Sequence, residues 1–179
     1  MMRWSLLLLG ALTCLGPLAA SAHGPTPQKV EEKIVLKSSP ADVWAVVSDF
    51  GGIVNWHPGV ETAEATGGNK PGAERTLTLK SGGVIVDGLD EYNAEEMSYG
   101  YRLSKENIEA LPVSFYSATL SVKPGDGGGS EVVWLGRFYR ADTSNFPPEN
   151  LNDQAAVKAM ETFFREGLEG LKAKVAAGK

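Results

Sequence analysis

Residues 152–176 read N-D-Q-A-A-V-K-A-M-E-T-F-F-R-E-G-L-E-G-L-K-A-K-V-A, and this stretch decides the fold. Its apolar residues recur at helical spacing and form one broad face, while charged residues occupy the rest of the helix. A face so wide has to be buried against another element, so we expect this helix to lie on the rest of the chain. The face consists of Ala156, Met160, Phe163, Phe164, Gly167, Leu168, Leu171 and Val175.

Upstream of this helix the sequence predicts mainly antiparallel strands. The first is expected at 29–37, where apolar residues largely alternate with charged ones. Turn sequences such as Gly67-Gly68 and Ser81-Gly82-Gly83 then separate a series of further strands, which predicts a meander. These later strands are expected at 60–66, 73–80, 84–92, 97–103, 114–123 and 131–141.

Two short helices are expected between the first and second strands. Ser39 can cap a helix and Pro40 suits its first turn, and this helix should end near 49–52. A second short helix is expected at 53–56, because Pro58 stops it. The whole order predicts an α+β fold in which a curved seven-stranded antiparallel sheet holds the long C-terminal helix. The gap between sheet and helix is the natural place for a cavity.

The first 22 residues have the pattern of a cleavable secretory signal peptide. Arg3 supplies a positive charge, residues 6–15 a short apolar run, and Ala20-Ser21-Ala22 a cleavage site. We expect cleavage after Ala22, a flexible lead-in at 23–28 and a single domain at 29–177, located in the periplasm or secreted. The apolar run is shorter than the roughly 20 residues that a membrane span needs, so no span is expected in the mature chain. A lipoprotein anchored through Cys14 is the alternative.

Cysteine content and charge exclude several classes of function. Cys14 is the only cysteine of the chain, so removal of the signal peptide leaves no thiol for catalysis, disulfides or metal binding. The chain carries 17 basic and 22 acidic residues, a net charge of −5, and loss of Arg3 makes it one unit more negative. Nucleic-acid binding requires a basic stripe, which is absent from the sequence, so we expect no nucleic-acid partner.

Several motifs in a fixed order resemble the START-like helix-grip superfamily, also called SRPBCC. This superfamily includes birch-pollen-allergen-like proteins, plant abscisic-acid receptors and the bacterial polyketide cyclase/dehydrase and lipid transport group. The resemblance covers almost the whole mature chain and implies the helix-grip fold with a ligand cavity. The motifs are S-P-A-D-V-W-A-V-V-S-D-F-G at 39–51, W-H-P at 56–58, P-G-A-E-R at 71–75, S-G-G at 81–83, L-P-V-S-F-Y-S-A-T-L-S-V at 111–122 and W-L-G-R-F at 134–138.

More narrowly, the segment A-H-G-P-T-P-Q-K-V-E-E at 22–32 resembles the MxaD-type periplasmic proteins of bacterial methanol oxidation. This resemblance implies a non-enzymatic accessory that assists the contact between methanol dehydrogenase and its cytochrome acceptor. Two alternatives use the same cavity: a carrier of a small hydrophobic molecule, and an enzyme of the cyclase/dehydrase type. An enclosed pocket reached through the 81–83 turn and the 111–115 loop would favour the carrier, and an exposed apolar or acidic patch the accessory.

Period-two alternation predicts which strand residues face the interior. Arg75 alternates with leucines, and Asp87 with Ile85 and Leu89, so both charged groups are expected to point inward and to form an ion pair. In the plant hormone receptors, the matching strand positions hold charged groups that face the ligand, and the resemblance places His57 as another ligand-facing cation. The expected cavity residues are His57, Arg75, Asp87, Tyr99, Tyr101, Tyr116, Trp134, Phe138, Met160 and Phe163.

Each of these residues also has an ordinary structural interpretation. Arg75 and Asp87 could be exposed surface charges, and the apolar candidates could simply form the core. His57 is the one candidate for proton transfer near neutral pH, but no Ser-His-Asp order or carboxylate pair accompanies it. We therefore assign no catalytic residue, cofactor or metal. Copper binding by an amino-terminal His23, with His57 as a second ligand, is a further alternative.

Overall fold

The computed structural model describes residues 25–178. The predicted signal peptide with its cleavage site, Cys14 and the possible copper ligand His23 lie outside these residues. The described chain contains β1 (Gln28–Leu36), α1 (Pro40–Val47), the 3-10 helix η1 (Phe50–Asn55), β2 (Val60–Thr66), β3 (Glu74–Leu79), β4 (Val84–Asn93), β5 (Ser98–Lys105), β6 (Val113–Pro124), the 3-10 helix η2 (Asp126–Gly128), β7 (Ser130–Arg140), the 3-10 helix η3 (Glu149–Leu151) and α2 (Asp153–Ala177).

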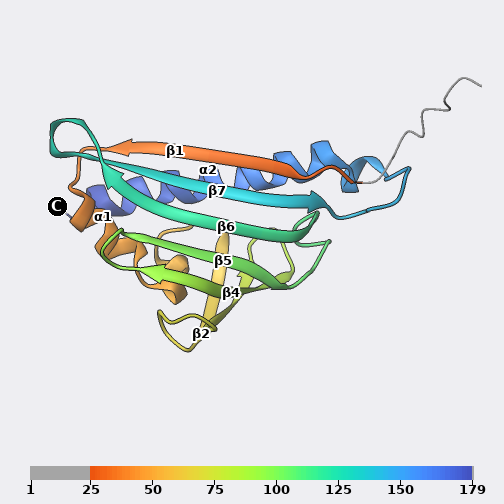
Figure 1. Cartoon of the computed structure of the whole chain (residues 1–179), viewed down its shortest axis with the longest axis horizontal. Coiled ribbons are helices and arrows are strands. Elements are labelled where there is room, and N and C mark those ends of the chain that lie inside the picture. The colour runs from red at the N-terminus through yellow and green to blue at the C-terminus, as the bar shows by residue number, and fades with distance from the viewer. Residues whose placement is uncertain (1–24, 179) are drawn as a thin grey trace, which may run out of the picture.

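All the strands belong to one antiparallel sheet, which is seven-stranded and has the order β1-β7-β6-β5-β4-β3-β2. The first strand closes onto the last, with Gln28 opposite Phe138 and Leu36 opposite Ser130 (Figure 1). The predicted helix-grip architecture is thus confirmed. The second short helix begins earlier than expected, at Phe50, because the Asp49 side chain accepts a hydrogen bond from Gly51 N–H and caps it there.

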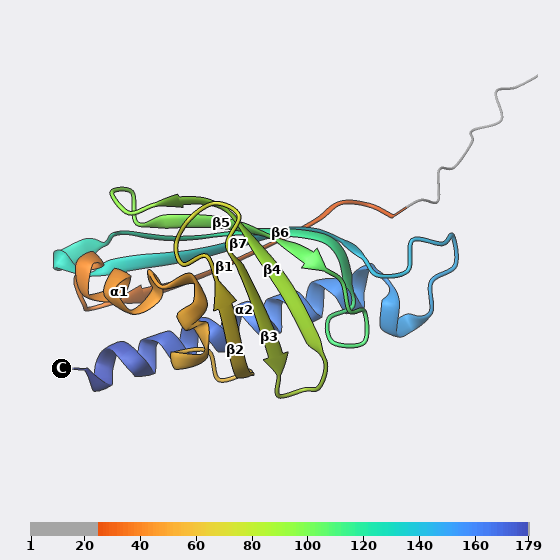
Figure 2. The same cartoon turned by 90° about the horizontal axis from the view of Figure 1, so that it is seen from below.

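Helix α2 runs along one face of the sheet for most of the length of the molecule (Figure 2). Its first turn is capped by Asn152, whose side-chain oxygen accepts a hydrogen bond from Ala155 N–H at 2.9 Å. The buried residues of α2 are the eight that the sequence predicted as its apolar face. No helix within residues 25–178 is both long and apolar enough to cross a membrane.

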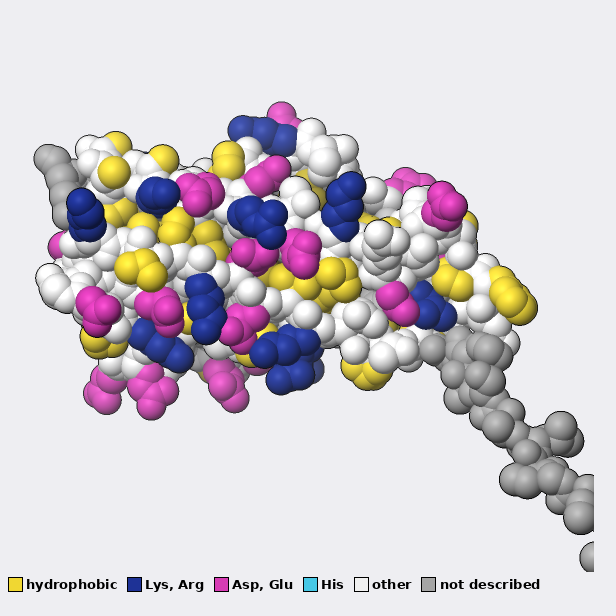
Figure 3. Space-filling model, turned by 90° about the horizontal axis from the view of Figure 1, so that it is seen from above, with side chains coloured by type: hydrophobic (Ala, Val, Ile, Leu, Met, Phe, Trp, Pro, Cys, Tyr) yellow, Lys and Arg dark blue, Asp and Glu magenta, His cyan; other side chains and the backbone are white. Residues whose placement is uncertain are grey.

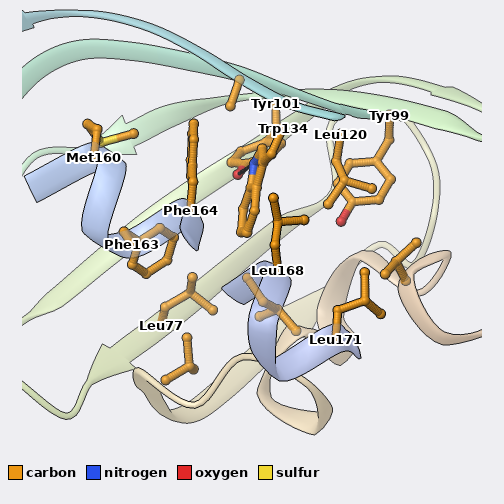
Figure 4. Close-up of a cluster of buried hydrophobic side chains, with 14 of the residues drawn as sticks. Leu77, Tyr99, Tyr101, Leu120, Trp134, Met160, Phe163, Phe164, Leu168 and Leu171 are labelled. Carbon is orange, nitrogen blue, oxygen red and sulfur yellow. Dashed lines mark hydrogen bonds between the residues drawn. The ribbon is translucent and has the colours of Figure 1, made fainter. Parts of the chain in front are cut away.

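The core fills the space between α2 and the sheet with aromatic and aliphatic side chains (Figure 4). The ring of Phe164 from α2 stacks on Trp134 from β7, with ring centroids 4.5 Å apart. Gly136 lies on the same strand, and a Cβ there would stand 2.9 Å from the Phe164 ring. The strand and the helix are therefore in direct contact at this point, and no ligand-sized gap separates them.

Two glycines let α2 approach the segment 56–58. A Cβ at Gly167 would lie 2.6 Å from both His57 Cδ2 and Trp134 Cζ3, and one at Gly170 would overlap the Trp56 carbonyl oxygen and lie 2.5 Å from Pro58 Cδ. Gly167 and Gly170 thus permit the close helix contact that fixes His57 in the interior.

Candidate functional site

Arg75 and Asp87 form the ion pair that the strand alternation predicts. They lie opposite each other on β3 and β4, and each side chain is 1% exposed. Arg75 Nε and Nη2 donate to Asp87 Oδ2 at 3.0 and 2.9 Å, and Nη1 donates to the Phe50 carbonyl at 2.9 Å. The guanidinium also lies over the rings of Phe50 and Tyr101, 4.2 and 4.5 Å from their centroids. The pair is thus held inside the core.

Burial acts on both members of this pair. It favours the neutral form of Arg75, but the Asp87 carboxylate and the nearby tyrosines outweigh it and raise the pKa of Arg75 above its ordinary value. Burial also raises the pKa of Asp87, against the opposing effect of Arg75. Asp87 Oδ1 has no hydrogen-bond partner within the described residues. Asp87 is therefore held by Arg75 through one of its two carboxylate oxygens.

Next to this pair lies a cluster of hydroxyl and indole groups. The Tyr101 hydroxyl accepts hydrogen bonds from the Tyr116 hydroxyl at 2.8 Å and from Trp134 Nε1 at 2.9 Å. Burial raises the pKa of Tyr101 and Tyr116 well above their ordinary value, and it raises the pKa of Tyr99 to about 12. All three phenols are consequently protonated at neutral pH, so none supplies a phenolate as base or nucleophile.

His57 is enclosed by its neighbours and is 1% exposed. Its Nε2 lies 2.9 Å from the Phe163 carbonyl oxygen, and its Nδ1 accepts a hydrogen bond from Gly59 N–H at 3.0 Å. A carbonyl oxygen only accepts, so Nε2 carries the proton. Burial lowers the pKa of His57 to about 4. Burial and these backbone contacts therefore favour the neutral imidazole at this position, whereas the family resemblance implied a ligand-facing cation.

The structure brings the ten candidate residues together, but in the core. All ten are buried. Of them, Phe163 lines the large groove described next, while the others contact one another and the remaining core side chains. Within residues 25–178 no group of three or more His, Cys, Asp or Glu side chains could hold a metal ion.

The large groove lies between the first half of α2 and the turn that joins β3 to β4. Its volume is about 940 Å³. Ser81 and Leu111 belong to the two loops through which a pocket was expected to open, and both line the groove. The full lining consists of Pro58, Gly59, Leu79, Lys80, Ser81, Ala110, Leu111, Asn150, Ala155, Lys158, Ala159, Thr162, Phe163 and Glu166.

The groove exists because α2 presents small residues to it. Ala155, Ala159 and Thr162 follow helical spacing on a face next to the apolar one, and all three line the groove. Their short side chains leave space above Leu79, Leu111 and Phe163, which are buried. This wall was not among the features predicted from the sequence. The spacing of two alanines and a threonine beside the apolar face was the signal that could have located it.

Charged side chains on one face of the described molecule form no surface suited to a nucleic acid. On the face seen in Figure 3, acidic and basic side chains are interspersed and form no basic stripe. This agrees with the net charge of −5 for the whole chain. The large groove is therefore the best candidate for a binding site.

Comparison with known protein families shows to which family this chain belongs. Residues 27–176 match the family described as polyketide cyclase / dehydrase and lipid transport. The chain belongs to this family. No curated protein matches the chain in sequence.

Solved structures share the fold of this family member at low sequence identity. The protein XoxI from Bacillus cereus is 24% identical, with a TM-score of 0.70 over 83% of this chain and 95% of that one. The Zhui aromatase/cyclase from Streptomyces sp. R1128 is 16% identical, with a TM-score of 0.63 over 86% and 93%. Norcoclaurine synthase from Thalictrum flavum, in complex with dopamine and hydroxybenzaldehyde, is 15% identical, with a TM-score of 0.63 over 99% of both chains. At these identities the similarity shows the fold alone.

Proposed function

We propose that this protein binds a small apolar molecule in the groove beside α2 and carries it without changing it chemically. The groove itself supports this function. Its volume of about 940 Å³ falls within the range of about 300–1,000 Å³ that is usual for ligand pockets. Leu79, Leu111 and Phe163 give it an apolar floor, so an apolar ligand would lose contact with water there.

The state of the buried candidate groups favours a carrier over an enzyme that would use them for catalysis. General acid–base catalysis needs a group that can exchange a proton with the substrate near the working pH. His57 is neutral, and both of its ring nitrogens are engaged by backbone groups. Tyr99, Tyr101 and Tyr116 hold their protons in the core. Of these four side chains, none lines the groove.

Binding of the neutral dye Nile red, followed by its fluorescence, tests the carrier. We expect saturable binding to the wild-type protein and its loss in Ala159→Trp, because an indole at this position fills the groove. Ala173→Trp, at an exposed position of the same helix, is the matched control and should bind as the wild type does. Equal dye binding by both variants would contradict the assignment, provided that both retain the wild-type thermal transition.

We also propose that the carrier is exported, on the basis of the pattern in residues 1–22. Expression of the full chain in a Gram-negative bacterium and separation of its periplasm test this. The expected result is a periplasmic protein whose amino-terminal residue is His23. A cytoplasmic protein that retains Arg3 would overturn the proposal.

A second candidate function is the MxaD-like accessory role in methanol oxidation, and one exposed aromatic residue supports it. Phe115 is 75% exposed and has a φ of 48°, a left-handed conformation that is unusual for a bulky residue. Its ring lies edge-on to the Tyr139 ring, with centroids 6.3 Å apart, and its backbone N–H donates a hydrogen bond to the Glu106 carboxylate. Strained residues of this kind concentrate at functional sites, and an exposed aromatic side chain suits a protein partner.

The accessory role is tested with purified periplasmic methanol dehydrogenase and its cytochrome acceptor. We expect the wild-type protein to increase the rate of cytochrome reduction and Phe115→Ser to lose this effect. Val35→Ser, which also removes an exposed apolar side chain, is the control. Identical rates with and without the wild-type protein would exclude this role and leave the carrier untouched.

A further inference from the structure

Three charged side chains line the groove, and their balance is positive. Lys80 follows the end of β3, whereas Lys158 and Glu166 come from α2. The groove thus carries two cations and one anion, in a chain whose net charge is −5. Its sign is opposite to that of the whole protein, so the groove would attract an anionic ligand.

Neither groove lysine is neutralised by a protein carboxylate. Within residues 25–178, Lys80 and Lys158 have no carboxylate oxygen within 4.0 Å, the limit for an ion pair. By contrast, Lys172 on the exposed side of α2 pairs with Glu169 at 3.4 Å. The ammonium groups of Lys80 and Lys158 are therefore free to pair with a ligand.

The charges are distributed unequally along the groove. Lys80 N–H donates to the Gly59 carbonyl at 2.9 Å, and Glu166 Oε2 would lie 3.4 Å from a Cβ at Gly59. Lys80 and Glu166 thus both lie near Gly59, at one end of the groove. Lys158 lies eight residues before Glu166 on α2, about 12 Å away along the helix axis. Lys158 is therefore the cation that lies away from the carboxylate of the groove, and Asn150 lines the same groove.

We infer that the ligand is an anionic amphiphile, with its apolar body over Leu79, Leu111 and Phe163 and its negative head group at Lys158. This inference rests on the proposed carrier function and adds the chemical class of the ligand. An ammonium group is a compact point charge that pairs with a carboxylate or a phosphate alike. The common feature is therefore a single anionic head, and experiment separates the two chemistries.

Dansyl-undecanoic acid and its methyl ester form a matched pair of fluorescent probes for this test. The two differ in charge and share the apolar body. At low ionic strength the acid should bind the wild-type protein about fivefold more tightly than the ester, the effect of one modest ion pair. Added salt should weaken binding of the acid and leave binding of the ester unchanged.

Lys158→Met removes the charge and keeps an unbranched side chain, so it should abolish the preference for the acid without changing the affinity for the ester. Lys172→Met, which removes the same charge outside the groove, should retain the preference. Displacement of the bound acid by dodecanoate or by dodecyl phosphate then identifies the preferred head group.

Failure of the inference can be distinguished from failure of the carrier function. If Nile red binds but acid and ester bind equally, the ligand is not selected by charge and the inference is overturned while the carrier stands. The same follows if Lys158→Met and Lys172→Met change the preference equally. If neither Nile red nor the two dansyl probes bind, the carrier function itself is wrong.

Discussion

Arg75 is a charged side chain enclosed by aromatic rings, and its place in the core depends on Asp87. A charge removed from water is costly unless hydrogen bonds and an opposite charge replace the solvent. Asp87, the Phe50 carbonyl and the faces of Phe50 and Tyr101 supply these replacements. Because these contacts involve several strands and a helix, Arg75 fixes the relative position of β3, β4, β5 and η1.

Removal of one member of the pair should destabilise the protein strongly. Arg75→Met leaves the Asp87 carboxylate buried without its partner, and we expect the free energy of unfolding in urea at pH 7 to fall by about 3–5 kcal/mol. Asp87→Leu should have a comparable effect. The double variant should lose much less than the sum, because it contains no buried charge from this pair. Additive losses would show that the two groups do not interact.

His57 should make stability depend on pH in a defined window. Its pKa is about 4 in the folded protein, against an ordinary value of 6.5 in the unfolded chain. Above pH 6.5 both states are neutral at this residue, and its contribution to stability is fully present. As the pH falls from 6.5 towards 4, the unfolded chain binds a proton that the folded protein excludes, so up to about 3 kcal/mol of stability is lost.

The variant His57→Gln lacks this titration. Urea unfolding of both proteins at pH 7 and pH 4.5 should show that the stability difference between them narrows by about 2–3 kcal/mol at the lower pH. The comparison cancels the titration of the carboxylates that the two proteins share. Parallel pH profiles would mean that His57 titrates in the folded protein as it does in the unfolded chain.

At the scale of single elements, α2 was predictable in full because its signal is local. Its apolar residues repeat within one helix, and the structure buries that same set. The state of His57 was not predictable, since its hydrogen bond to the Phe163 carbonyl joins residues 106 positions apart in the sequence. The wall that α2 contributes to the groove was missed for a related reason, although two loops that line the groove were predicted. This wall consists of short side chains that leave space unoccupied, whereas sequence periodicity identifies the side chains that fill the core.

At one glycine of α2, replacement by alanine is expected to destabilise the protein, which is the opposite of the usual effect in a helix. In a helix, Gly→Ala normally stabilises by about 1 kcal/mol. At Gly170 the new Cβ would overlap the Trp56 carbonyl oxygen and lie 2.5 Å from Pro58 Cδ, so α2 would have to move. We expect Gly170→Ala to lower the free energy of unfolding in urea by about 1–3 kcal/mol.

The control for this variant lies on the same helix. Ala173→Gly, at an exposed position, should destabilise by about 1 kcal/mol through helix propensity alone. If Gly170→Ala were as stable as the wild type or more stable, the contact between α2 and residues 56–58 would be looser than the structure shows.

At the scale of the whole molecule, the sheet and α2 depend on each other. The inner face of the sheet is covered by α2, which contributes Met160, Phe164 and Leu168 to one continuous core (Figure 4). The sequence indicated this dependence correctly, since a wide apolar helix face and a sheet with one apolar face each need a partner. The sequence predicted two loops that line the groove, whereas the place of the groove beside α2 follows from the three-dimensional arrangement.

A chain that ends at residue 151 should therefore not fold cooperatively. Without α2 the inner face of the sheet is exposed to water. We expect the near-ultraviolet circular dichroism to be lost, anilinonaphthalene sulfonate to bind, and the thermal transition not to be cooperative. A chain that ends at residue 177 keeps all of α2 and should behave as the full protein does. A sharp thermal transition in the shorter chain would show that the sheet is stable alone.

The way β1 closes onto β7 has a mechanical consequence. The start of β1 and the end of α2 lie at opposite ends of the long axis of the molecule (Figure 1). A pulling force applied between residues 28 and 177 would thus act along β1, at right angles to the hydrogen bonds that join it to β7. Those bonds would be loaded in shear and all at once, so the protein should rupture at a high force in single-molecule stretching, in contrast to the low-force unzipping of a strand peeled from its end.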